Sequence, residues 1–172
     1  QKDHEILYWV RMDRVFKIEQ SLFPKTIFHE YTDAIKGCPA EKLQDLRLEP
    51  LSREFIHTFS QTEAEILTMT EKWYESWSIN KRKDLYYDML SYWKTVLEKC
   101  KPDVIIFPDT PHEMYNFVIY NLAKHLKIRT ILFENIMEYN RLIDFEDYKI
   151  GNQNVMEESK RGFPKKVSVD EL

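Results

Sequence analysis

The sequence predicts an α/β fold, a Rossmann-like parallel sheet flanked by helices, and three observations lead to that prediction. Short apolar runs rich in β-forming residues occur at 6–10, 104–107 and 130–133. Helical patterns with an apolar stripe lie before the second run and between the second and the third. The links between these segments are short. Strands that alternate with helices in this way are typical of right-handed βαβ units.

The composition is that of a globular protein rich in aromatic residues. Of the 172 residues, 43% are hydrophobic, 31% charged and 14% aromatic, and the net charge is −4. Aromatic side chains bury large areas, so the chain can form a substantial core. A negative net charge without a broad basic surface argues against nucleic acid as a partner. No apolar run reaches the roughly 18 residues of a transmembrane segment.

The scarcity of glycine and cysteine narrows the classes of site. Three glycines, Gly37, Gly151 and Gly162, cannot build a Gly-rich phosphate loop. Two distant cysteines form neither a CxxC motif nor a disulfide scaffold, which favours a reducing compartment. The charged start at 1–5 does not resemble a signal peptide. We therefore expect a cytoplasmic protein, with the inner face of the membrane as an alternative location.

The first half of the chain is expected to hold one strand and several helices. The run at 6–10 has the pattern of a buried strand. One or two short helices fit 15–36, before a turn at 37–39. A long helical pattern begins near Ser52, and a second helix covers about 83–100.

The second half carries the βαβ pattern. The run at 104–107 is expected to be a strand buried on both faces, followed by a helix and then by a strand at 130–133. After 134 the pattern weakens. We expect residues 1–151 to form the α/β domain and 152–172 to be a polar tail or a linker toward a second domain.

The stretch DTPHE at 109–113 has a structural explanation. Thr110 can cap a helix, with Pro111 as its first residue and Glu113 as its third. Thr-x-x-Glu is a capping box, and proline at the first helical position loses no hydrogen bond. The stretch therefore predicts a helix that begins at Pro111.

The same stretch also predicts a catalytic site, because ligands of open α/β folds bind beyond the carboxyl ends of the strands. Capping does not require a histidine at 112, and a histidine beside carboxylates can act as a general base near neutral pH. His112 and Asp109 are the catalytic candidates, and Glu113 is a substrate-binding candidate. Zinc is disfavoured because Asn116 stands where a His-Glu-x-x-His motif needs its second histidine.

Charged residues that follow the other strands are further substrate-binding candidates. Glu134 and Arg141 follow the run at 130–133, and Arg11 follows the first run. Parallel strands share their carboxyl edge, so these residues are expected near His112. Arg141 could pair bidentately with a phosphate or carboxylate, although a surface ion pair explains it equally simply.

The remaining histidines and the tryptophans are expected to be structural. His29 and His57 fall in segments with a helical pattern and lack polar companions at useful spacing. Trp73, Trp77 and Trp93 are expected in the core.

The segment KPDVIIFPDTPHEMYNFVIYNLAKHLKIRTILFENIMEYNR at 101–141 resembles the central part of bacterial capsule and surface-polysaccharide biosynthesis proteins. In those proteins a strand ends in a loop with Pro-His, a helix bearing Tyr and Ala follows, and a short passage leads into the next strand. The matching residues here are 111–113, Tyr120, 122–124 and 128–133.

The resemblance implies a glycosyltransferase-like protein with two Rossmann-like domains, the GT-B arrangement, of which this chain looks like the amino-terminal half. It implies a carbohydrate acceptor on this half and a nucleotide-sugar donor on the other, with no cofactor on this chain. It makes His112 the candidate base or acceptor contact. The implied protein partner is a second domain or a second copy.

Two other functions fit the residues. One is a non-catalytic α/β binding or assembly domain of the same pathway. The other is a small hydrolase or phosphate-handling enzyme that uses Asp109, His112 and Glu134. The absence of a Gly-rich loop and of a Gly-x-Ser-x-Gly motif weighs against the second of these.

Overall fold

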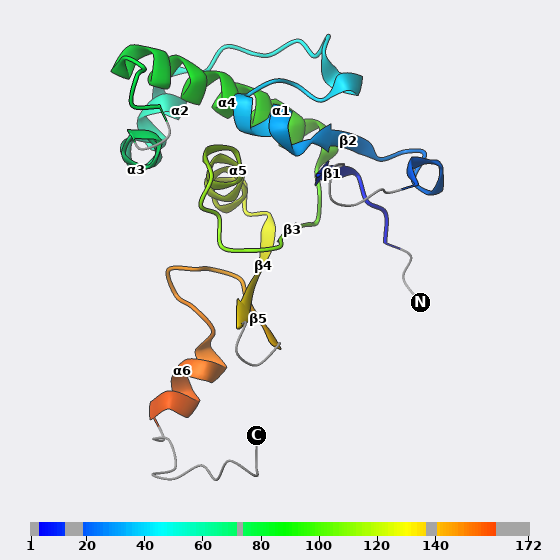
Figure 1. Cartoon of the computed structure of the whole chain (residues 1–172), viewed down its shortest axis with the longest axis vertical. Coiled ribbons are helices and arrows are strands. Elements are labelled where there is room, and N and C mark those ends of the chain that lie inside the picture. The colour runs from blue at the N-terminus through cyan, green and yellow to red at the C-terminus, as the bar shows by residue number, and fades with distance from the viewer. Residues whose placement is uncertain (1–3, 13–18, 72–73, 137–140, 161–172) are drawn as a thin grey trace.

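The computed structural model describes residues 4–12, 19–71, 74–136 and 141–160 (Figure 1). The order of the strands and helices is β1 (Tyr8–Arg11), η1 (Gln20–Leu22), β2 (Ile27–Glu30), α1 (Tyr31–Lys36), η2 (Glu41–Leu43), α2 (Arg53–Thr58), α3 (Ser60–Glu71), α4 (Ile79–Cys100), β3 (Val104–Phe107), α5 (Met114–His125), β4 (Arg129–Ile136), β5 (Arg141–Phe145) and α6 (Gln153–Lys160). Strands and helices are mixed along the chain, with α2, α3 and α4 in succession before β3, and β4 and β5 in succession after α5.

The described strands form two small sheets. β1 pairs with β2 in parallel, which places Arg11 opposite Glu30 at their carboxyl ends. β3 pairs in parallel with β4, and β4 pairs antiparallel with β5. The α/β class of the prediction is confirmed at this level, with small parallel and mixed sheets flanked by helices. The antiparallel strand β5 and helix α6 fall in the region after 134, where the sequence pattern is weak.

The core lies between α4, α5 and the two sheets. The fully buried side chains Tyr86, Met89 and Leu90 come from α4, and Val118 and Leu122 come from α5. α4 begins earlier than the expected position near 83, because the Ser78 hydroxyl accepts a hydrogen bond from the Lys81 backbone N–H at 3.3 Å and caps the helix.

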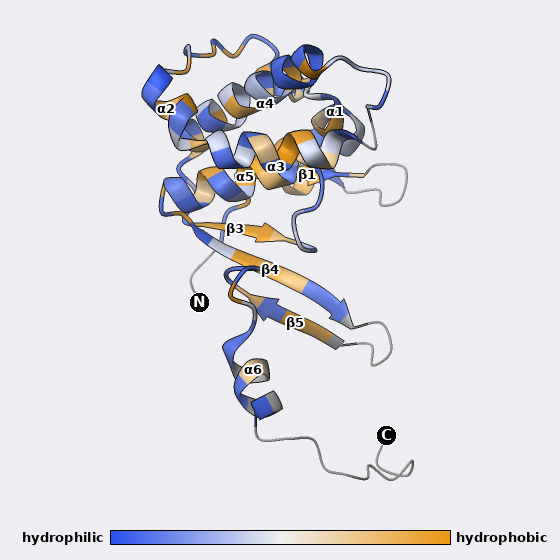
Figure 2. Ribbon diagram, turned by 90° about the vertical axis from the view of Figure 1, so that its left-hand side faces the viewer, coloured by the Kyte–Doolittle hydropathy of each residue, from blue (hydrophilic) through white to orange (hydrophobic). Residues whose placement is uncertain are grey.

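The expectation that 104–107 is buried on both faces is wrong. Successive residues of a strand point to opposite sides. Phe107 faces the core, whereas Ile106 is 61% exposed. On β5, the strand on the other side of β4, Leu142 is 65% exposed. The ribbon of β3 has the colour of hydrophobic residues in Figure 2. Helix α5 packs on the opposite face, against β4.

The expected helices at 15–36 are replaced in part by β2. Residues 13–18 lie outside the described part of the chain, and α1 starts only at Tyr31. The long helical pattern from Ser52 is divided into α2 and α3 at Phe59, whose backbone leaves the helical conformation. His29 is therefore a strand residue and not a helical one.

Gly37 ends α1 in a left-handed conformation, with φ at 73°. A Cβ at this position would lie 2.7 Å from Leu85 Cδ1 and 3.4 Å from two Met89 atoms. Gly37→Ala is therefore expected to lower the free energy of unfolding by about 1–3 kcal/mol, measured by urea denaturation.

Gly151→Ala is the matched control for Gly37→Ala. Gly151 has nearly the same φ, 74°, but its added Cβ would meet only Met156 Sδ at 3.9 Å. This variant should lose only the backbone contribution, about 1 kcal/mol. Equal losses in the two variants would show that Leu85 and Met89 give way without cost.

Candidate functional site

Helix α5 begins at Met114 and not at Pro111, so the predicted capping box at Thr110 is wrong. Glu113 is the N-cap residue of this helix, and Asn116 is its third residue. Asn116 Oδ1 accepts a hydrogen bond from the Glu113 backbone N–H at 2.9 Å. The Thr110 hydroxyl instead donates to Glu134 Oε2 at 2.9 Å. The competing partner on β4 therefore leaves 108–112 as a loop at the carboxyl end of β3.

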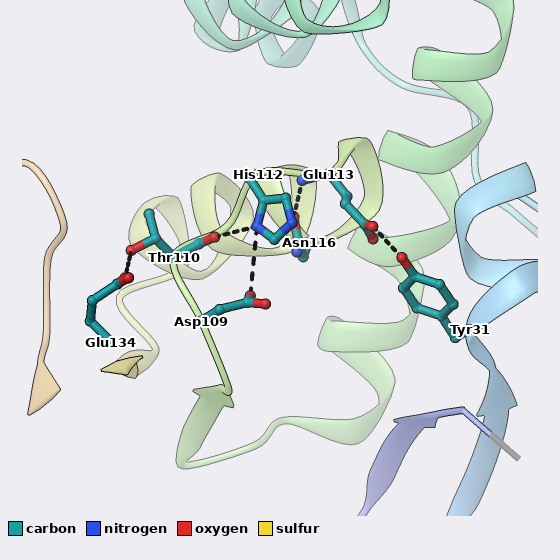
Figure 3. Close-up of polar contacts among 7 residues, drawn as sticks. All are labelled: Tyr31, Asp109, Thr110, His112, Glu113, Asn116 and Glu134. Atoms are coloured by element: carbon teal, nitrogen blue, oxygen red, sulfur yellow. Dashed lines mark hydrogen bonds and ion pairs between the residues drawn. The ribbon is translucent and has the colours of Figure 1, made fainter. Parts of the chain in front are cut away.

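His112 is held in one orientation within this loop (Figure 3). Its Nδ1 lies 2.8 Å from the Thr110 carbonyl oxygen. A carbonyl oxygen only accepts, so Nδ1 carries the hydrogen and Nε2 keeps the lone pair of the neutral ring. Asp109 Oδ1 lies 3.8 Å from the same Nδ1. The two side chains are 65% and 53% exposed, so Nε2 can meet a molecule from solution.

Glu113 is drawn away from His112 toward α1. The Tyr31 hydroxyl donates a hydrogen bond to Glu113 Oε1, and the two side chains point at one another in Figure 3. Burial, together with this bond to Glu113, raises the pKa of Tyr31 to about 12. Glu113 Oε2 is buried and has no hydrogen-bond partner among the residues that the structure describes. Glu113 therefore has one oxygen engaged by the protein and one unsatisfied.

The other two candidates near the loop have different outcomes. Glu134 lies within β4 and accepts a hydrogen bond from Thr110. It is therefore close to the loop that carries Asp109 and His112, as predicted, and we call Asp109, Thr110, His112 and Glu134 the His112 group. Arg141 is the first residue of β5, and its Cα is paired with that of Ile136 at the carboxyl end of β4. The side chain of Arg141 lies outside the described part of the structure.

Arg11 belongs to a second group, at the carboxyl end of β1. Its guanidinium carbon lies 4.8 Å from the centre of the Phe28 ring. In the orientation of the Gln20 amide that satisfies both its oxygen and its nitrogen, the side-chain oxygen accepts hydrogen bonds from the two terminal Arg11 nitrogens at 2.6 and 2.8 Å. A cleft of ≈ 250 Å³ opens here, and its lining residues are Arg11, Gln20, Phe28, Glu30, Asp33, Glu41 and Lys42.

A buried polar network was missed by the sequence reasoning. His29 is 1% exposed, and its Nδ1 lies 2.7 Å from the Tyr8 hydroxyl, which lies 2.9 Å from the Tyr92 hydroxyl. Its Nε2 lies 2.9 Å from the Cys38 carbonyl oxygen. The run Thr26-Ile27-Phe28, followed by a helical pattern and a glycine, was the signal that could have placed His29 on a strand.

The described residues lack two features, a metal-binding group and a helix able to cross a membrane. They contain no group of three or more His, Cys, Asp or Glu side chains placed to hold a metal ion. No helix within them has the length and apolar character needed to cross a membrane. Compared with protein-family models, with curated proteins and with solved structures, the chain matches none.

Proposed function

We propose that this chain is the acceptor-side domain of a glycosyltransferase-like protein of bacterial surface-polysaccharide biosynthesis. The observation that carries the proposal is the geometry of His112. Its Nδ1–H is fixed on the Thr110 carbonyl oxygen at 2.8 Å, which leaves Nε2 as an accessible base at the carboxyl end of a parallel strand.

The proposed reaction needs one proton acceptor from this chain. An acceptor hydroxyl gives its proton to His112 Nε2 while its oxygen attacks the anomeric carbon of a sugar nucleotide. The bond from that carbon to the nucleotide phosphate breaks, and the phosphate leaves with the electron pair. Asp109, 3.8 Å from Nδ1, stabilises the imidazolium that forms. In this scheme the nucleotide sugar lies on a second domain.

The proposal includes a Rossmann-like arrangement, and the order of the strands supports it. The two sheets have the orders β2-β1 and β3-β4-β5. Placed edge to edge, they would give 2-1-3-4, the order of the first four strands of flavodoxin-like doubly wound sheets, with β5 added antiparallel at the edge. In that order the switch point lies between β1 and β3, and Arg11 and His112 follow these two strands.

The test is polysaccharide output in cells that carry His112→Ala in the full-length protein. Loss of a general base typically slows a reaction by about 100- to 10,000-fold, so output should collapse. His57→Ala, which removes an exposed histidine from α2, is the matched control. Circular dichroism of both variants establishes that the fold survives. Unchanged output in folded His112→Ala would overturn the proposal.

A second candidate function is a non-catalytic binding or assembly domain. The observation that favours it is the open apolar side of the second sheet, with Ile106 61% and Leu142 65% exposed. Sheets built from parallel strands are ordinarily covered on both faces. This function requires that His112 can be replaced without loss, so the same experiment separates the two candidates.

A further inference from the structure

The cleft beside Arg11 has the position of a ligand site. Its lining includes Arg11 and Glu30, the last residues of the parallel strands β1 and β2, and Asp33 of α1. Ligands of α/β folds bind beyond this edge of the sheet. Its lining comes from separate segments of the chain: the ends of β1 and β2, both short 3-10 helices, and α1. The surface is therefore assembled by the fold.

Two carboxylates in the lining are available to a ligand. The side chains of Asp33 and Glu41 make no hydrogen bond or ion pair with the rest of the described chain. By contrast, the lining cations have protein contacts: Arg11 lies over Phe28, and Lys42 Nζ donates to the Thr26 carbonyl oxygen at 3.0 Å. The cleft thus offers acceptors with unused lone pairs beside donors that are already positioned.

The charges of the lining select among ligand classes. It contains three acids and two bases, and this net negative charge disfavours a phosphate or a nucleotide. The acids are also not grouped as a metal site, since the described residues contain no set of three ligands for an ion. A neutral ligand that donates several hydrogen bonds fits both facts.

We infer that this cleft binds one neutral, polyhydroxylated ring, the chemistry of a single sugar unit. Hydroxyl groups donate to Asp33 and Glu41 and can accept from the Lys42 ammonium. The volume, ≈ 250 Å³, is below the roughly 300–1,000 Å³ of pockets that hold drug-sized molecules, which favours a single ring over a nucleotide sugar. The inference rests on the lining of the cleft and does not require His112.

The test is binding of defined probes to the full-length protein, observed by saturation-transfer NMR and titration. The probes are methyl glucoside, methyl galactoside and N-acetylglucosamine, with inorganic phosphate and uridine diphosphate as anionic competitors. We expect a neutral sugar to bind and the anions not to displace it. Asp33→Asn with Glu41→Gln should weaken that binding by about tenfold or more, because hydrogen bonds to charged acceptors are lost.

Glu98→Gln is the control, because it removes one carboxylate from the exposed surface of α4 and should leave sugar binding unchanged. Binding of no neutral probe, displacement by phosphate, or full binding in the Asp33 and Glu41 double variant would each overturn the inference. The result is independent of the His112 experiment. Sugar binding that persists in His112→Ala would separate the cleft from the catalytic proposal, whichever way polysaccharide output changes.

Discussion

Trp93→Ala is expected to lower the free energy of unfolding by about 3–5 kcal/mol, the range for removal of a large buried aromatic side chain. Trp93 is 2% exposed. Its ring lies 5.3 Å from that of Tyr8, 5.6 Å from His29, 5.1 Å from Tyr92 and 6.3 Å from Tyr115. These neighbours come from β1, β2, α4 and α5, so the cavity would open where the first sheet meets both helices.

Urea denaturation followed by circular dichroism measures this loss, with coincident transitions at two wavelengths as the check for two-state unfolding. Trp93→Phe should keep part of the contact and lose clearly less. Trp77→Ala is the control at a half-buried position, where the indole contacts Tyr74 and Lys81. A Trp93→Ala loss no larger than that of Trp77→Ala would contradict the central position of Trp93.

The buried His29 network should make the protein less stable as the pH falls below 6.5. Burial lowers the pKa of His29 from 6.5, an effect only partly opposed by the bond to the Cys38 carbonyl. The unfolded chain therefore binds the proton more readily than the folded one. The contribution of His29 is fully present above 6.5 and declines below it, down to the folded pKa, by at most about 1.4 kcal/mol per pH unit.

The hydrogen bonds of the network explain why the neutral ring is favoured. The Cys38 carbonyl requires a hydrogen on Nε2, so Nδ1 accepts from the Tyr8 hydroxyl. Tyr92 then donates to Tyr8 and accepts from the Ala40 backbone N–H at 3.0 Å. A second proton on His29 would reverse this chain and leave the Tyr92 hydroxyl hydrogen facing another donor.

The measurement is the free energy of unfolding of the wild type and of His29→Gln between pH 5 and pH 7.5. The pH dependence of the unfolding free energy that is lost in His29→Gln but kept in His57→Gln is due to His29. NMR titration of the His29 ring gives the pKa directly, should His29→Gln not fold. A midpoint at or above 6.5 would contradict the prediction.

The sequence predicted best those elements whose apolar pattern is local and uninterrupted. The strand at 104–107 has the bounds of β3, and the helix between it and 130–133 was expected. β2 was missed because its burial depends on Tyr8 and Tyr92, which lie far from it in the sequence. The start of α5 was misplaced because Thr110 has a partner on β4 that capping rules do not include.

The candidate site was predicted in part for the same reason. His112, Asp109 and Glu134 are neighbours in space because they follow or end adjacent parallel strands, and that rule can be applied to sequence alone. The cleft was not predicted. Asp33, Glu41 and Lys42 line it only because the chain after β2 folds back toward the ends of β1 and β2, and no local sequence pattern indicates that course. Arg11 was found as a candidate, and the structure shows that it lines this cleft.

The side-chain hydrogen bond from Tyr31 to Glu113 connects the residues next in sequence to the cleft and to His112. Tyr31 directly follows Glu30, which lines the cleft, and Glu113 directly follows His112. The bond therefore joins the segment that lines the cleft to the loop that carries His112. Because thermodynamic coupling between two sites is reciprocal, a cleft ligand that changed the affinity at His112 by some factor would have its own affinity changed by the same factor. The Tyr31–Glu113 pair is the side-chain contact through which such a change would pass from one segment to the other.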